Sequence, residues 1–268
     1  SNSKNSVMKI LLQNKYLLDF LAAIMFFTRI PINWKFFSNK PPNLTRAAWC
    51  FPLIGSVIGI ISGILGDLCL FINLPIFLSC TIAITLSLFI TGAFHEDGLA
   101  DMADGFGAGG SPAKINKIMH DSRLGTYGTV ALTLGLLIRL GLAISLVELG
   151  YSLTVILAFS FASGKLSIIF IRNFFNVSTF SKTGSIIENV STKNWIIASI
   201  LWFVPVAFVF PFWAILFGFI LNFCIIFIIG KMSQSKLNGI TGDILGATAF
   251  TTELVFLLGL TIYLRSPF

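Results

Sequence analysis

The chain has 268 residues, of which 56% are hydrophobic and only 11% are charged. Soluble domains carry about 25% charged residues, and a mean hydropathy of +0.91 with 28 Phe leaves too little polar surface to cover a water-soluble particle of this size. The composition excludes a soluble globular protein and predicts a single membrane-embedded domain over residues 1–268.

The first apolar stretch is too short to cross a membrane. Tyr16 to Thr28 lies between Lys15 and Arg29, whereas a crossing helix needs about 20 mainly apolar residues. We therefore expect an N-terminal interfacial helix on the membrane surface. The stretches from Ala47 to Gly66 and from Leu68 to Phe94 are uncharged and long enough to cross.

An acidic segment follows, and its spacing indicates a metal site. Asp97, Asp101 and Asp104 stand at i, i+4 and i+7, so a helix would hold all three within an arc of roughly 60°. Like charges at this spacing repel each other unless a cation lies between them. Oxygen ligands suit magnesium or manganese, which take one or two carboxylates plus substrate phosphates. The alternative is a solvated acidic face at a helix start, where the helix dipole favours acids.

A glycine-rich run from Gly105 to Gly110 comes next and is by itself only a weak indication of phosphate binding. Arg123 strengthens this interpretation, because its planar guanidinium fits phosphate oxygens. The alternative is that Arg123 only anchors the topology at the membrane face. His95 and His120 are interpreted as ordinary interfacial polar residues rather than proton carriers.

The next two predicted spans each contain one cation. Leu124 to Val147 contains Arg139, and Tyr151 to Ile171 contains Lys165. A charge inside a span must face a partner or a cavity, so both residues are functional candidates. Lys165 is near enough to the basic end of its span to reach a cavity there, and Asp67 is one candidate partner for Arg139.

The C-terminal part completes the predicted bundle. Asn194 to Gly230 is uncharged and long enough for two short spans broken near Pro205 and Pro211, and the final span runs from about Ile244 to Leu264. We therefore predict an all-α, polytopic membrane helical bundle of about seven transmembrane helices plus the interfacial helix. Asp243 precedes the final span on the side of the three aspartates.

Cations mark one side of this predicted bundle. The loops on that side carry eleven, namely Lys35, Lys40, Arg46, Lys114, Lys117, Arg123, Arg172, Lys182, Lys193, Lys231 and Lys236. The short opposite loops, near residues 72–75, 148–150 and 205–211, carry none. By the positive-inside rule the acidic segment and Asp243 face the cytoplasm, and we expect the cations to contact membrane lipid.

Short motifs spread over nearly the whole chain carry a family resemblance. They are Thr28-Arg-Ile-Pro, Phe51-Pro-Leu-Ile-Gly, His95-x-Asp-Gly-Leu-Ala-Asp-x-x-Asp-Gly, Asp121-Ser-Arg-Leu-Gly-Thr-x-Gly, Thr241-Gly-Asp-x-Leu-Gly-Ala and Glu253-Leu-Val-Phe-Leu-Leu. With these motifs the chain resembles the cobalamin synthase family, the membrane-bound adenosylcobinamide-GDP ribazoletransferases. It departs from the family at Ser163-Gly-Lys165, where Ser-Arg-Gly is common.

The resemblance implies a reaction and a role for each candidate residue. The 3′-hydroxyl of α-ribazole, or of its 5′-phosphate, would attack the cobinamide-side phosphorus of adenosylcobinamide-GDP, and GMP would leave. Asp97, Asp101 and Asp104 would bind Mg²⁺, and Asp121 would be a further ligand or the base. The implied catalytic residues are Asp104, Asp121 and Arg123, and the implied substrate contacts are Ser122, Arg123, Lys165, Thr241 and Asp243.

The resemblance also implies where the protein is located and what it binds. We expect a multi-pass protein of the bacterial cytoplasmic (inner) membrane whose active-site loops face the cytoplasm. The expected partners are the corrinoid nucleotide, α-ribazole and membrane lipid, without nucleic acid. The apolar spans also allow a homo-oligomer.

Two other functions are compatible with parts of the sequence. A CDP-alcohol phosphotransferase signature begins like Asp101-x2-Asp104-Gly-x2-Ala108, but Gly109 stands where that signature has Arg, and Asp121 comes one residue too early. A membrane transporter would explain charges inside spans. Transporters commonly show internal repeats, which this sequence lacks.

Overall fold

The computed structural model describes residues 14–181 and 187–266, and its regular elements there are all helices. They are α2 (Lys15–Phe27), α3 (Trp34–Phe37), α4 (Leu44–Ala47), the 3₁₀ helix η1 (Ala48–Cys50), α5 (Phe51–Phe71), α6 (Ile76–Thr91), α7 (Phe94–Ala108), α8 (Pro112–Met119), α9 (Thr126–Glu148), α10 (Leu153–Phe174), α11 (Thr192–Ala207), α12 (Phe212–Leu237) and α13 (Gly242–Arg265). The all-α prediction is confirmed. Lys182, one of the cations used to predict orientation, lies outside the described residues.

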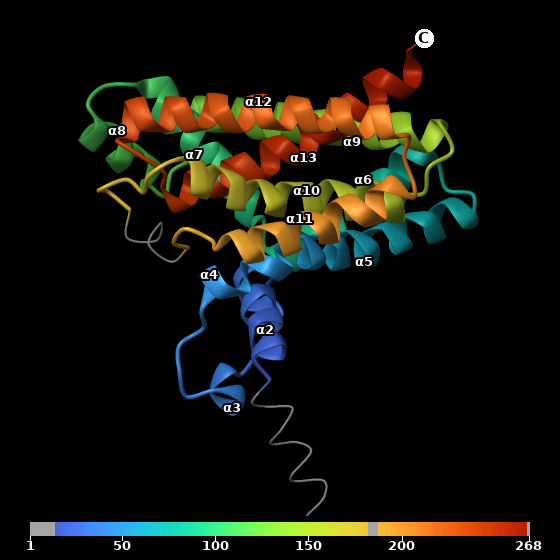
Figure 1. The fold of residues 1–268 in the computed structure, drawn as a ribbon. Helices are drawn as coiled ribbons and strands as arrows, with labels where there is room; N and C mark the ends of the chain where they lie inside the picture. Colours follow the sequence, from blue (N-terminus) through green and yellow to red (C-terminus); the bar gives the residue numbers. More distant parts are fainter. Residues whose placement is uncertain (1–13, 182–186, 267–268) are drawn as a thin grey trace, which may run out of the picture.

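The long helices lie side by side in a bundle, with α8 at one end and the C-terminus at the other (Figure 1). Within the described ranges, five helical segments are long and apolar enough to cross a membrane, and the pair α6 and α7 brings the number up to six if it counts as one broken span. Helix α11 is apolar but shorter. The structure therefore supports a multi-pass membrane protein, and the predicted count of seven is not confirmed.

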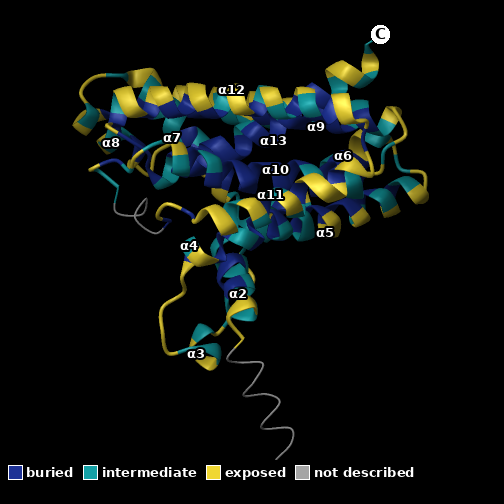
Figure 2. Ribbon diagram, viewed as in Figure 1, coloured by how far each residue is buried: buried dark blue, intermediate teal, exposed yellow. Residues whose placement is uncertain are grey.

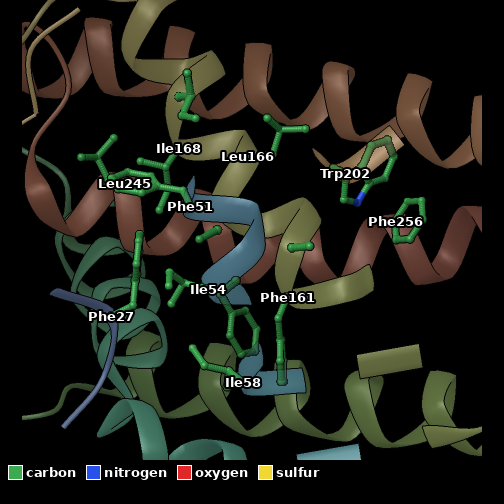
Figure 3. Close-up of a cluster of buried hydrophobic side chains, with 14 of the residues drawn as sticks. Phe27, Phe51, Ile54, Ile58, Phe161, Leu166, Ile168, Trp202, Leu245 and Phe256 are labelled. Carbon is green, nitrogen blue, oxygen red and sulfur yellow. The ribbon is translucent and has the colours of Figure 1, made fainter. Parts of the chain in front are cut away.

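Helices α10 and α13 form the centre of the bundle, and most of their residues are buried (Figure 2). Three glycines of α5 make close packing against α10 feasible. Because Gly55, Gly59 and Gly63 follow one another at intervals of four, they lie on one face of α5, where a Cβ on Gly59 would be only 2.4 Å from the backbone of Ala158. Phe51, Ile54 and Ile58 of α5 continue this contact into the apolar cluster drawn in Figure 3, which also includes Phe161 of α10.

The predicted N-terminal helix corresponds to α2, which projects from the bundle with α3 beyond it (Figure 1). Its attachment is polar. The carboxylate of Asp19, which is only 3% exposed, accepts a 2.6 Å hydrogen bond from Arg46 Nε and a 2.9 Å bond from Trp49 Nε1. These bonds fasten α2 to the segment that leads into α5. Its place at the membrane surface stays a prediction.

The acidic segment is helical, and it is set at an angle to the preceding helix. Gly92 and Ala93 both have left-handed backbone conformations (φ 65° and 55°), and α6 and α7 meet at a bend of 87°. A non-glycine residue such as Ala93 is strained in this conformation. The bend directs α7 across the end of the bundle, where it packs against α13 and α9.

Candidate active site

A cavity of about 450 Å³ opens at the end of the bundle where α7, the segment after α8 and the start of α13 meet. The side chains that give it chemical character come from three stretches far apart in the sequence. They are Asp97 and Asp101 from α7, His120, Asp121, Ser122 and Arg123 from the turn after α8, and Thr241 and Asp243 from the start of α13. Most of the predicted site residues therefore line one cavity, and the two that do not are Asp104 and Lys165.

A glycine brings α7 and α13 together at this cavity. A Cβ at position 98 would lie 2.7 Å from the carbonyl oxygen of Asp243, closer than real Cβ atoms approach backbone. Only glycine permits this contact without a shift of one helix. Because Gly98 lies between Asp97 and Asp101, the close approach places both carboxylates beside Asp243.

These acids form a repulsive group. Asp101 lies beside Asp243 and interacts electrostatically with it and with Asp97. Negative charges at such short range repel each other, and a nearby cation relieves the repulsion. Within the described residues, no three His, Cys, Asp or Glu side chains lie close enough together to hold one metal ion by themselves. The donor set is nevertheless all oxygen, the type that Mg²⁺ prefers.

In the turn after α8, Asp121 and Arg123 form an ion pair at the cavity. Asp121 Oδ2 accepts a 2.8 Å hydrogen bond from Arg123 Nη2, and Oδ1 accepts bonds from the Arg123 side chain and backbone. These bonds lower the pKa of the Asp121 carboxyl to about 2 and raise that of the Arg123 guanidinium. The Arg123 side chain is 87% exposed, so it is free to turn toward a ligand in the cavity.

The start of α13 forms part of the wall. The hydroxyl of Thr241 caps the helix by accepting a hydrogen bond from the backbone N–H of Ile244, and Asp243 lies in the first turn. A helix start carries a partial positive charge and free N–H groups, which favour an anion such as a phosphate. Ser122, next to Arg123 in the sequence, also lines the cavity.

Asp104 has a different setting from the other aspartates. Its two carboxylate oxygens accept hydrogen bonds of 2.7 Å from the backbone N–H groups of Gly125 and Gly128. Gly125 is the residue before α9 and has no side chain to cap that helix, so Asp104 supplies the missing acceptor from α7. The structure therefore shows Asp104 fixing the start of α9, while its role as a metal ligand or catalytic group stays a prediction.

Lys165 is also in a different setting. It is 2% exposed, and its ammonium group lies 3.5 Å from Glu253 Oε1 inside the bundle, away from the cavity lining. Arg139 donates to Glu253 Oε2 at 2.5 Å and to Glu96 Oε1 at 3.2 Å. The suggested pairing of Arg139 with Asp67 is therefore wrong.

Asp67 instead serves a structural role at the start of α10. Its carboxylate accepts hydrogen bonds from the backbone N–H groups of Leu153 and Thr154 and from the Thr154 hydroxyl, at 2.6 to 3.0 Å. Since this helix start lacks enough acceptors of its own, the distant acid satisfies it.

The roles of His120 and of the glycine run in this site could not be predicted from the sequence. His120, interpreted as an ordinary polar residue, lines the cavity and faces the charge of Asp243; its only sequence signal is its place before Asp121. The glycine run contributes nothing to the lining, because Gly105 and Gly107 belong to α7 and the positive φ angles of Gly109 and Gly110 form the turn to α8.

Comparison with known proteins agrees with this site. The family model described as Cobalamin-5-phosphate synthase matches residues 19–261. A Clostridium botulinum (strain Loch Maree / Type A3) protein named adenosylcobinamide-GDP ribazoletransferase is 37% identical over 247 residues, covering 90% of this chain and 96% of the relative. A protein of the same name from Azorhizobium caulinodans is 31% identical over 259 residues, covering 94% and 98%.

A third relative of this name, from Leptospira interrogans, is 32% identical over 252 residues, covering 91% of this chain and 94% of the relative. No solved structure gives a significant match. The family match extends over both α7 and the start of α13, so it includes all three stretches that form the cavity. The chain belongs to the cobalamin-5-phosphate synthase family.

Proposed function

We propose that this protein joins adenosylcobinamide-GDP to α-ribazole, or to its 5′-phosphate, and releases GMP. The reaction closes the nucleotide loop of the cobamide and is the activity named for the relatives. The observation that carries the proposal is a single cavity lined by Asp97, Asp101 and Asp243, by Arg123 and by Thr241 at the start of α13. A pyrophosphate needs this combination of groups, because phosphoryl transfer depends on positioning and on neutralising charge.

Asp97 and Asp101 are the residues that would hold Mg²⁺, with Asp243 completing the site or binding a ribose hydroxyl. Their fit rests on the close approach of α7 to α13 at Gly98, which places both carboxylates beside Asp243, and on the repulsion that a divalent cation would remove. Bound Mg²⁺ would neutralise charge on the pyrophosphate oxygens. Substrate phosphate oxygens and water would complete the coordination, as is usual for this ion.

Arg123 would hold the phosphate of the leaving GMP or the phosphoryl group under attack. In the free protein its guanidinium is paired with Asp121, and a phosphate offers it a second planar partner. When Arg123 turns to the substrate, the Asp121 carboxylate loses its partner and becomes a better proton acceptor. We therefore propose that Asp121 accepts the proton of the attacking hydroxyl or serves as a further ligand of the metal.

The reaction forms one bond and breaks one. The ribose 3′-oxygen bonds to the cobinamide-side phosphorus, its proton passes to the base, and the bridging oxygen leaves with the electron pair as part of GMP. Ser122 and Thr241 both line the cavity and would position the two substrates. Lys165 contacts substrate in this scheme only if its ammonium group moves away from Glu253.

We also propose that the cavity faces the cytoplasm of a bacterial cell, in the cytoplasmic membrane. The cations that support this orientation gather at the cavity end, among them Lys114 and Lys117 in α8 and Lys236 at the end of α12. Nucleotide substrates would then reach the site from the compartment in which they are made.

The test uses purified protein in detergent or liposomes with Mg²⁺, adenosylcobinamide-GDP and α-ribazole. We expect GMP and a cobamide to appear in equal amounts. A parallel reaction receives a CDP-alcohol and a lipid acceptor and should release no CMP. Turnover of the CDP-alcohol without formation of a cobamide would overturn the proposal in favour of a lipid phosphotransferase.

A further inference from the structure

We propose that Glu253 is a positioning residue, which acts through a group of buried charges to fix the orientation of α7 and thereby of Asp97 and Asp101. This buried charge network consists of His95, Glu96, Arg139, Lys165 and Glu253, side chains that are each at least nine-tenths buried. The proposal rests on the proposed function, because it explains how the residues assigned to Mg²⁺ are held in place.

Glu253 connects four helices. From α13, its Oε2 accepts a hydrogen bond from Arg139 of α9, and its Oε1 lies 3.5 Å from Lys165 Nζ of α10 and 3.6 Å from His95 Nδ1 of α7. The last two distances exceed direct hydrogen bonds, so Lys165 interacts with Glu253 through charge, and His95 lies beside the same carboxylate as a buried polar group. Glu96 of α7 then binds Arg139 in turn.

The network does more than neutralise single charges. It contains two cations and two anions, so with a neutral His95 it has no net charge. A charge inside an apolar span is costly, and well-packed apolar residues often serve stability as well as a buried ion pair does. Apolar contacts are not directional, however, whereas hydrogen-bonded ion pairs fix the rotation of the helices that carry them. The network therefore supplies orientation that apolar side chains would not.

Helix α7 needs such a constraint. The 87° bend at Gly92 and Ala93 separates it from α6, so the preceding helix does not set its rotation. Two polar contacts do so instead. His95 and Glu96 hold its first turn to the network, and Asp104 holds its far part to the start of α9.

The metal-binding candidates lie between these two fixed points. Asp97 directly follows Glu96, and about 100° of rotation per residue turns it from the buried side of α7 toward the cavity. Asp97 is exposed at the cavity wall, whereas Glu96 is buried behind it, and the buried His95 borders both the cavity and the network. A small rotation of α7 would therefore move Asp97 and Asp101 relative to Asp243.

The experiment compares a variant in which the network carries an excess charge with one in which its charges balance. Glu253→Gln leaves the network with an excess positive charge and is expected to lower thermal stability in detergent. The double variant Glu253→Gln with Arg139→Gln leaves Glu96 opposite Lys165, so the charges balance again and stability should recover. Asp67→Asn is the matched control, because Asp67 is a half-buried acid whose hydrogen bonds go to the start of α10.

Two measurements then separate positioning from stability. Hydrogen exchange should rise in residues 94–108 of the double variant and stay unchanged in α10, and kcat/KM should fall about tenfold to a hundredfold with a higher Mg²⁺ requirement. Asp67→Asn should lose stability but keep wild-type exchange in α7 and wild-type kinetics. A double variant of wild-type stability whose α7 exchange is also unchanged would overturn the positioning role.

The exchange measurement needs no substrate, so it tests the positioning of α7 even if the wild-type protein forms no cobamide. If the proposed function is wrong, the wild-type protein itself will form no cobamide, and that result is independent of the variants. Increased exchange in α7 together with unchanged kcat/KM would overturn the link from Glu253 to the reaction.

Discussion

Gly98 of α7 lies so close to Asp243 of α13 that the carbonyl oxygen of Asp243 would be 2.7 Å from any Cβ placed at position 98. Gly98→Ala must therefore shift one helix, which moves Asp97 and Asp101 away from Asp243. Because small displacements of reacting groups are costly, we expect kcat/KM to fall roughly tenfold or more, with a higher Mg²⁺ requirement. GMP release at increasing Mg²⁺ measures both effects.

Gly141→Ala is the control for this substitution. Gly141 lies in α9, and a Cβ there would meet nothing within 4 Å. Alanine is also the better helix former, so this variant should match the wild type in activity and equal or exceed it in stability. Equal activity of both alanine variants would show that the close contact at Gly98 does not matter.

Asp104→Ala should mainly affect stability. It removes the acceptor for two backbone N–H groups at the start of α9, and loss of a helix cap costs about 1–2 kcal/mol. Thermal unfolding in detergent measures this, and Asp104→Asn, which keeps one acceptor oxygen, should lose less. If Asp104→Ala instead unfolds at the wild-type temperature and has no turnover, the residue is a metal ligand or catalytic group, as the sequence predicts.

The pH dependence of the reaction should not reflect Asp121. With its pKa lowered to about 2 by Arg123, Asp121 is ionised in the folded protein throughout the neutral range. The stabilisation from this pair is present above the ordinary carboxyl pKa of about 3.9 and is lost as the pH falls through about 2. We therefore expect the acid limb of kcat/KM between pH 5 and 8 to keep its midpoint in Asp121→Asn, at a lower rate. If the acid limb disappears in Asp121→Asn, Asp121 titrates in this range, which would contradict the lowered pKa of its carboxyl.

Part of this site could be predicted from the sequence, because it depends on patterns among residues that are close together along the chain. The i, i+4, i+7 spacing of Asp97, Asp101 and Asp104 predicts one helical face, and α7 is a helix there. The side of the bundle on which Asp243 lies follows from the alternation of apolar spans. Such patterns repeat over a few residues, and they depend on backbone geometry alone.

The partners of the acids could not be predicted, because they come from distant parts of the chain. Glu253 lies 114 residues from Arg139, and Asp67 lies 86 residues from the N–H of Leu153 that it binds. Periodicity predicts which residues share a face but not which helix covers that face. For the same reason the sequence indicates that Lys165 can reach a cavity at the basic end of its span, but it does not reveal Glu253 as the residue beside its ammonium group.

The orientation of the cavity can be tested by labelling. Lys114 lies in α8 at the cavity end, and Leu149 directly follows α9 at the opposite end. In whole cells, a reagent that does not cross the membrane should label Leu149→Cys and leave Lys114→Cys unlabelled until the cells are opened. Both variants are made in a Cys224→Ala background, which is also the control, because Cys224 is exposed whereas Cys50, Cys69 and Cys80 are buried. Labelling of both variants from outside would contradict the cytoplasmic orientation of the cavity.

The central claim is that the aspartates of this cavity carry out the transfer. The most direct test compares the wild type with Asp101→Asn, a variant that keeps the size of the side chain and removes its charge. With adenosylcobinamide-GDP, α-ribazole and Mg²⁺, the wild type should form one cobamide for each GMP released, and folded Asp101→Asn should form none. Wild-type turnover by Asp101→Asn would contradict the claim.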